Sequence, residues 1–132
     1  MSSMKTIARP FALVAALLSA ATSSAQPLDI EEQLRTFATC AGRLSAVMEH
    51  QWMFDGPASE HTQRRRDAVL ELVEAAMPPE RGSEVLQWRI SAKVAQAGLL
   101  TRATFNNDAR DAAWARAQAD RLARACTGLL LS

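Results

Sequence analysis

Apolar residues recur along most of this chain at alternating intervals of three and four positions. The clearest series is Ile30, Leu34, Phe37, Ala41, Leu44 and Met48. This spacing places all six side chains along one stripe of an α-helix. Asp29 before the series, with Glu32 three residues later, is typical of a helix start. We therefore predict a first helix over residues 29–54, ended by the turn sequence Asp55-Gly56-Pro57.

Two further helices are predicted by similar patterns. One begins near Ser59 and ends at Met77, because Pro78 and Pro79 stop it. Its expected inward residues are Val69, Leu70, Val73, Ala76 and Met77. The next begins near Ser83, and its expected inward residues are Leu86, Ile90, Val94 and Ala97. It either ends at Gly98 or continues toward Phe105, at a cost of about 1 kcal/mol relative to alanine.

A fourth helix follows Asn106-Asn107-Asp108, which offers turn and N-cap chemistry. Its expected inward residues are Ala112, Ala115, Ala119, Leu122, Cys126 and Leu129. No segment shows the alternation of a strand. Four amphipathic helices with short connections predict an all-α fold, a small up-down-up-down four-helix bundle that forms one domain over residues 26–132.

The residues before the first helix have the composition of a secretory signal peptide. Lys5 and Arg9 supply positive charge, residues 11–21 are apolar, and small residues precede a cleavage point after Ala25. We predict that residues 1–25 are removed and that no membrane-spanning segment remains. An uncleaved anchor is the less favoured alternative, because the apolar stretch is shorter than the roughly 20 residues that a membrane span needs.

Charge and composition limit the classes of partner. The whole chain has 15 Lys and Arg against 14 Asp and Glu. Loss of Lys5 and Arg9 leaves thirteen basic residues against fourteen acidic ones. This balance argues against nucleic acid or an anionic membrane as the partner. Abundant alanine and the excess of arginine over lysine suggest a bacterial protein, which we expect in the periplasm or outside the cell.

Cys40 and Cys126 are the only cysteines. In an exported chain an even number of cysteines favours a disulfide, which here would join the first and fourth helices. Clustered metal ligands and the C-x-x-C spacing of redox pairs are both absent. Each cysteine also stands in a C-x-G-x-L sequence, so Gly42 and Gly128 would let two helices approach closely; the alternative is chance similarity.

Two histidines near the turn between the first two helices are the candidate metal ligands. A divalent metal there could use Glu49, His50, Asp55, Glu60 and His61. Their spacing matches neither H-E-x-x-H nor the pattern of di-iron bundles. The sequence also lacks the G-x-S-x-G turn, a glycine-rich phosphate loop and a C-x-x-C-H haem motif, so we nominate no catalytic residue and expect no cofactor.

Three large apolar residues in succession, Trp52, Met53 and Phe54, cannot all enter one bundle interior. They would either close the end of the bundle or anchor a partner. The arginine run Arg64-Arg65-Arg66 would either bind an acidic partner or form a solvated, ion-paired helix face. Trp88 and Trp114 lie beside the apolar stripes and are expected to be packing residues.

The sequence therefore favours an exported, non-enzymatic helical protein that binds an unidentified protein partner in the cell envelope. The expected contact surface is the end formed by the first two helices, with Met48, Trp52, Met53, Phe54 and Arg64 to Arg66 as its residues. The alternative is a bundle that binds a small ligand or metal at the same end.

Overall fold

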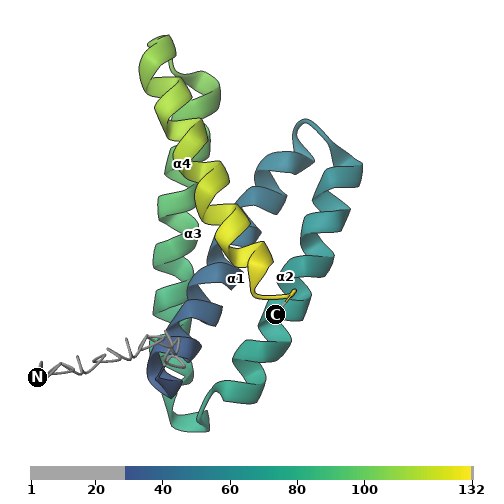
Figure 1. Cartoon of the computed structure of the whole chain (residues 1–132), viewed down its shortest axis with the longest axis vertical. Helices are drawn as coiled ribbons and strands as arrows, with labels where there is room; N and C mark the ends of the chain where they lie inside the picture. The colour runs from purple at the N-terminus through teal and green to yellow at the C-terminus, as the bar shows by residue number, and fades with distance from the viewer. Residues whose placement is uncertain (1–28, 132) are drawn as a thin grey trace, which may run out of the picture.

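The computed structural model describes residues 29–131 as four helices and no strand (Figure 1). They are α1 (Ile30–Trp52), α2 (Gly56–Ala76), α3 (Gly82–Phe105) and α4 (Ala109–Gly128), with a short 3₁₀ turn, η1 (Pro79–Arg81), between α2 and α3. The helices alternate in direction, which confirms the predicted all-α, up-down-up-down fold. The predicted signal peptide and its cleavage point lie outside the described residues.

The ends of the helices follow local signals. The Asp55 carboxylate accepts a hydrogen bond from the backbone N–H of Ala58 at 3.0 Å and caps α2. With Pro57 in its first turn, α2 begins at Gly56, three residues before the predicted start. Asp108 caps α4 by accepting hydrogen bonds from the backbone N–H groups of Arg110 and Asp111. Asp29 precedes α1 but makes no side-chain capping bond.

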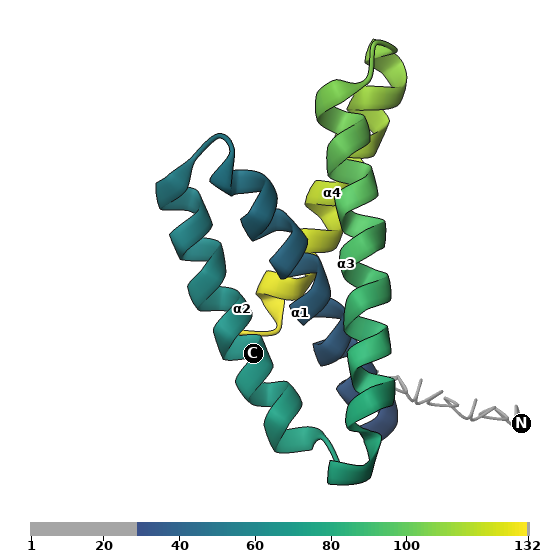
Figure 2. The ribbon, with the colours of Figure 1, turned by 180° about the vertical axis from the view of Figure 1, so that it is seen from behind.

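Helix α1 lies between α2 and α3 and contacts both extensively. Helix α4 packs mainly on α3 and makes a much smaller contact with α1. The chain thus forms two hairpins, α1–α2 and α3–α4, joined along α1 and α3, and their turns diverge at one end (Figures 1 and 2). The two splayed ends leave helix faces that no other part of the described chain covers.

The core is built mainly on α1. Leu34, Ala38, Ala41 and Leu44 of α1 are buried, and Val69 and Val73 of α2, Val85 of α3 and Cys126 of α4 pack with them. The predicted inward stripes of α1, α2 and α4 are therefore largely confirmed. Ile30 is an exception, because it begins α1 and lies exposed at the end of the helix.

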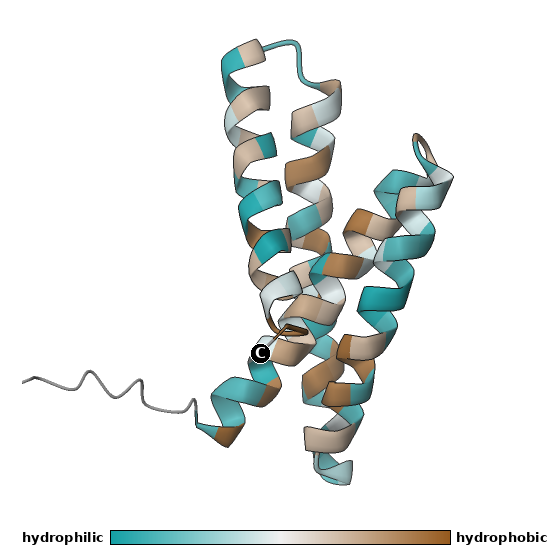
Figure 3. Ribbon diagram, turned by 45° about the vertical axis from the view of Figure 1, so that its right-hand side comes forward, coloured by the Kyte–Doolittle hydropathy of each residue, from teal (hydrophilic) through white to brown (hydrophobic). Residues whose placement is uncertain are grey.

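The predicted inward face of α3 is wrong. The side chains of Leu86, Ile90 and Val94 are 47%, 45% and 66% exposed. The buried residues of α3 are instead Val85, Gln96 and Ala103. Val85 precedes Leu86 by one residue, which is about 100° around the helix. Helix α3 continues through Gly98 and has apolar residues on several faces, as Figure 3 shows, so its sequence did not identify which face meets α1.

The predicted disulfide between Cys40 of α1 and Cys126 of α4 is present, with the two Cα atoms 5.3 Å apart. The proposed role of the neighbouring glycines is different from the prediction. A Cβ atom on Gly42 would lie 2.1 Å from the backbone oxygen of Arg89, so this glycine permits the close approach of α1 to α3 rather than to α4. A Cβ atom on Gly128 would meet nothing within 4 Å.

Candidate functional site

The residues at the end of α1 and just after it form an exposed apolar group at the tip of the first hairpin. Trp52, Met53 and Phe54 are each about 60% exposed. Successive residues on a helix point about 100° apart, and α1 ends here, so no single neighbour can cover all three. They do not fold over the core to close the bundle. The structure therefore places the three aromatic and methionine side chains where a partner could reach them.

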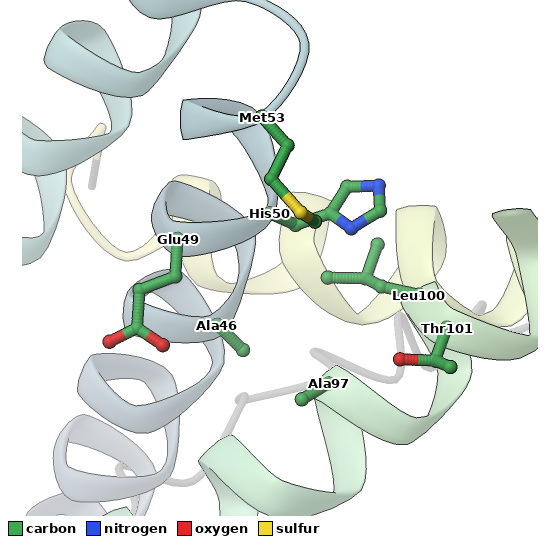
Figure 4. A pocket seen from close by; sticks show the side chains of 7 residues that line it. All are labelled: Ala46, Glu49, His50, Met53, Ala97, Leu100 and Thr101. Atoms are coloured by element: carbon green, nitrogen blue, oxygen red, sulfur yellow. The ribbon is translucent and has the colours of Figure 1, made fainter.

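A small hollow of about 180 Å³ continues from this tip into the groove between α1 and α3. Figure 4 shows Met53, His50 and Leu100 turned toward one another, while the carboxylate of Glu49 points away from them. Ala46 and Ala97 also line the hollow, and their short side chains leave space for it. Met53 thus connects the exposed tip with the groove.

His50 joins the two hairpins at the edge of this hollow. Its Nε2 lies 3.3 Å from the hydroxyl oxygen of Thr104 on α3, and its ring centroid lies 5.1 Å from that of Phe54. These contacts hold the end of α1 against α3 and orient the aromatic ring of Phe54. His50 thus lines the hollow and contacts α3.

A second hollow, of about 180 Å³, lies farther along the same groove. It is lined by Gly42 and Ser45 of α1 and by Leu86, Arg89, Ile90 and Lys93 of α3. Leu86 and Ile90 begin an exposed row on α3 that continues to Val94 at intervals of four residues. We call Met53, Ala97 and Leu100 together with this row the α1–α3 face.

The charges on the α1–α3 face leave one cation without a counter-ion. Lys93 Nζ lies 2.5 Å from Glu49 Oε1, and this ion pair crosses the groove between the two hollows. Arg89 forms no ion pair within residues 29–131, and its buried Nε has no hydrogen-bond partner there. The unpaired Nε–H costs free energy, and no carboxylate of the described residues balances the charge of the Arg89 guanidinium.

The other residues of the predicted contact surface lie elsewhere. Met48 is 3% exposed and is part of the α1–α2 packing, where its sulfur lies 3.4 Å from Arg66 Nη1. Arg66 also pairs with Asp67 at 2.8 Å. The run Arg64 to Arg66 belongs to α2, which packs on the side of α1 away from α3 (Figure 2). Neither Met48 nor the arginine run contributes to the α1–α3 face.

The five candidate metal ligands are not gathered around one point. Glu49 pairs with Lys93, His50 contacts Thr104, and Asp55 caps α2. His61 Nδ1 lies 3.5 Å from Arg64 Nη2, and Glu60 is exposed. Within residues 29–131 no group of three or more His, Cys, Asp or Glu side chains is arranged to hold a metal ion. Glu49, His50, Asp55 and His61 instead contact other side chains or cap a helix, and Glu60 is exposed.

The apolar pattern identified the α3 residues of this site but predicted that they lie in the core. The row Leu86, Ile90, Val94 and Ala97 has the spacing of a core stripe, and only the position of α1 shows that it is a surface. The sequence could not predict that Arg89 lacks an ion pair, because that depends on which carboxylates the other helices place beside it.

Comparison with known proteins adds no assignment. The chain matches no protein-family model, and no curated protein or solved structure resembles it closely enough to transfer a fold or a function. The α1–α3 face is therefore the feature of the molecule that best indicates a function.

Proposed function

We propose that this protein is exported and acts without catalysis, by binding an amphipathic helix of another protein in the periplasm or cell envelope. The observation that carries the proposal is the exposed row Leu86, Ile90 and Val94 beside two hollows in the α1–α3 groove. Grooves of this kind receive helices whose apolar residues recur every three or four positions. Met53 and the exposed tip would extend the contact at one end.

The spacing of the row favours a helix as the occupant. Residues four apart form a ridge on α3, and such ridges pack into the grooves of a second helix. Leu86 and Val94 are eight residues apart, which is about 12 Å along the helix axis. Two to three turns of a partner helix would cover this length.

The charges favour an acidic flank on that helix. Lys93 already has Glu49 as its partner, whereas Arg89 has no carboxylate partner among the residues described. Arginine binds carboxylates through paired N–H donors, so a Glu or Asp beside the apolar row of the partner would satisfy it. We therefore take the partner segment to be both apolar on one face and acidic on its edge.

Export is supported by one feature of the structure, the disulfide. Cys40 and Cys126 form a disulfide, and such bonds persist in oxidising compartments. None of the described helices combines the length and apolar character needed to cross a bilayer. Intact-mass measurement of protein recovered from the periplasm of expressing bacteria tests this part. The expected mass is that of residues 26–132 with no free thiol, and a chain that keeps residues 1–25 would contradict it.

The binding proposal is tested with a labelled synthetic helix that has leucines at intervals of three and four and glutamates along one edge. We expect saturable binding by fluorescence anisotropy and no comparable binding of a scrambled peptide. Ile90→Asp should weaken binding by about tenfold or more, because it places a charge in the apolar row. Ala117→Asp, on an exposed position of α4, is the matched control and should leave binding unchanged.

A second pair of measurements isolates the acidic edge. Arg89→Gln should weaken binding of the glutamate peptide but not of a version with lysines in place of the glutamates. The α1–α3 face would be refuted as the site if the scrambled peptide bound as tightly as the designed one. Equal affinity of the designed peptide for the wild-type protein and for Ile90→Asp would also refute it. Circular dichroism of each variant shows that the helices are intact.

A further inference from the structure

A separate hollow, lined by arginines, lies on the other side of the α1–α3 contact. It has a volume of about 340 Å³, within the range of small-molecule sites. Helix α4 crosses α1 and α3 on this side and supplies Leu122 to its wall (Figure 1). We call it the arginine hollow and define it by Arg35, Thr39 and Arg43 of α1, Trp88 and Gln96 of α3, and Leu122 of α4.

The arginine hollow holds two cations without ion-pair partners. Arg35 and Arg43 are two turns apart on α1, and neither forms an ion pair with a carboxylate of residues 29–131. No Asp or Glu lines the hollow. Arg43 is half-buried, and burial lowers the pKa of its guanidinium, with repulsion from Arg121 of α4 lowering it further. Arg43 is thus a partly buried cation beside a second positive charge, an arrangement that an accompanying anion would stabilise.

Trp88 holds one of these cations in place. The guanidinium carbon of Arg35 lies 5.3 Å from the centroid of the Trp88 ring, and that of Arg81 lies at the same distance. Arg81 is neutralised by ion pairs with Glu31 and Glu84, but Arg35 is not. Stacking on the indole therefore orders the Arg35 side chain without using its N–H donors. Those donors remain free to bind an anion.

Gln96 provides an independent indication of a ligand. Its side chain is 1% exposed, and its Nε2 donates to the backbone oxygen of Ala119 at 3.0 Å. Its Oε1 is buried without a hydrogen-bond partner. A buried acceptor without a donor costs about 1 to 3 kcal/mol, so such atoms in proteins are usually satisfied by a protein group, an ordered water or a ligand. Gln96 lines the arginine hollow and also a smaller hollow between α1, α3 and α4, and a donor in either one would satisfy its free atom.

We infer that the arginine hollow binds a small organic oxyanion, a phosphate monoester or carboxylate, that also carries a hydroxyl or N–H group. Arg43 and Arg35 bind the oxyanion, because guanidinium groups match its oxygens through paired donors. The hydroxyl or N–H donates to Gln96 Oε1. Leu122 and the alanines of α3 contact the apolar part of the molecule. This site is independent of the proposed helix-binding face.

The test uses Trp88 as the reporter. Trp52→Phe and Trp114→Phe replace the two exposed tryptophans and leave Trp88 as the only one. This protein is titrated with glycerol 3-phosphate, propyl phosphate, 3-hydroxybutyrate and butyrate at constant ionic strength. We expect a saturable change in Trp88 fluorescence, and the phosphate or carboxylate pair that binds more tightly identifies the class of anion.

Variants assign the two recognition elements. Arg43→Gln should weaken binding by about tenfold or more, because it removes a charge-assisted contact. Arg124→Gln, which removes the same charge from an exposed position on α4, should change affinity by less than about twofold. Each hydroxylated probe should bind more tightly than its counterpart without the hydroxyl, and Gln96→Met should remove that preference.

The rise in thermal unfolding temperature on ligand addition gives a second readout that also shows whether each variant is folded. The inference is overturned if no probe gives saturation, if Arg43→Gln binds as well as the parent protein, or if chloride produces the same response. Loss of helix binding at the α1–α3 face would leave this result unaffected, so the two proposals fail separately.

Discussion

Helices α1 and α3 have apolar stripes of similar spacing, but one stripe is buried and the other is exposed. The α1 stripe from Leu34 to Met48 is almost entirely buried, whereas Leu86, Ile90 and Val94 of α3 are exposed. Helix α1 has α2, α3 and α4 around it, whereas α3 has only α1 and α4 as large neighbours. An apolar stripe shows that a helix has a face to cover, and the arrangement of the other helices decides whether the same chain covers it.

The largest effect on this arrangement should come from separating α1 from α4. The Cys40–Cys126 bridge spans 86 residues, so its removal in a Cys40→Ala, Cys126→Ala variant should lower the free energy of unfolding by about 4 to 5 kcal/mol. The physical reason is the greater conformational entropy of the unfolded chain. Urea unfolding measures the change in the free energy of unfolding, with reduced wild-type protein as the control. An unchanged midpoint would show that the bridge contributes no stability.

Truncation of one residue in each stripe tests the comparison directly. Leu44→Ala removes a buried side chain from α1 and should cost about 2 to 5 kcal/mol of stability. Ile90→Ala removes an exposed side chain from α3 and should change stability by less than about 0.5 kcal/mol. Parallel urea unfolding curves measure both variants. Similar losses for the two would mean that the α3 row is covered in solution.

Two glycines offer a matched pair on the same two helices. Gly42→Ala places a methyl group against the backbone oxygen of Arg89 and should destabilise the protein by about 1 to 3 kcal/mol. Gly98→Ala adds a methyl group in open space within α3 and should stabilise it by up to about 1 kcal/mol. The thermal unfolding temperature should fall for Gly42→Ala and rise for Gly98→Ala. A stabilising Gly42→Ala would contradict the close approach of α1 and α3.

The smallest effect is expected at the exposed turn between α3 and α4. The hydrogen bond from Arg102 is the main cause that lowers the pKa of Asp111, with the Arg102 charge and the Asn106 amide acting in the same direction. The resulting stability is present above the unfolded-state pKa of about 3.9 and is lost as pH falls through the lower folded-state value. Solvent screening keeps the effect small.

Asp111→Asn should therefore lower the unfolding temperature slightly at pH 7. The difference from wild type should disappear as the pH falls below about 4. Asp120→Asn is the control, because Asp120 is exposed and forms no ion pair with the described residues. A difference that persists unchanged at low pH would assign the effect to the amide rather than to the charge.

Features that depend on nearby residues were predictable from the sequence. The cap at Asp108 and the stop at Pro78 involve residues within one helical turn, so the chain carries the signal locally. The disulfide was also predictable, because the chain has only one possible intramolecular pair. Three large residues in succession at one helix end predicted that at least one of Trp52, Met53 and Phe54 is exposed, but the sequence left open whether they close the end of the bundle, which they do not.

Features that depend on distant residues were not predictable in this way. Gly42 serves the contact with Arg89, which is 47 residues away in the sequence, although its place beside Cys40 suggested α4. Gln96 is polar and buried because α4 supplies a backbone partner for its amide. The candidate metal residues near the first turn were adjacent in sequence, but capping and ion pairs hold them apart.

The amino-acid sequence by itself determined four helices, most of their ends, and the covalent link between the first and the last. These are short-range properties, set by backbone hydrogen bonding, proline and glycine, and by the scarcity of cysteine. Tertiary structure alone decided which side of α3 faces α1, where hollows remain, and which arginines lack counter-ions. Those properties depend on side chains that the fold brings together from separate helices, so no local pattern could specify them.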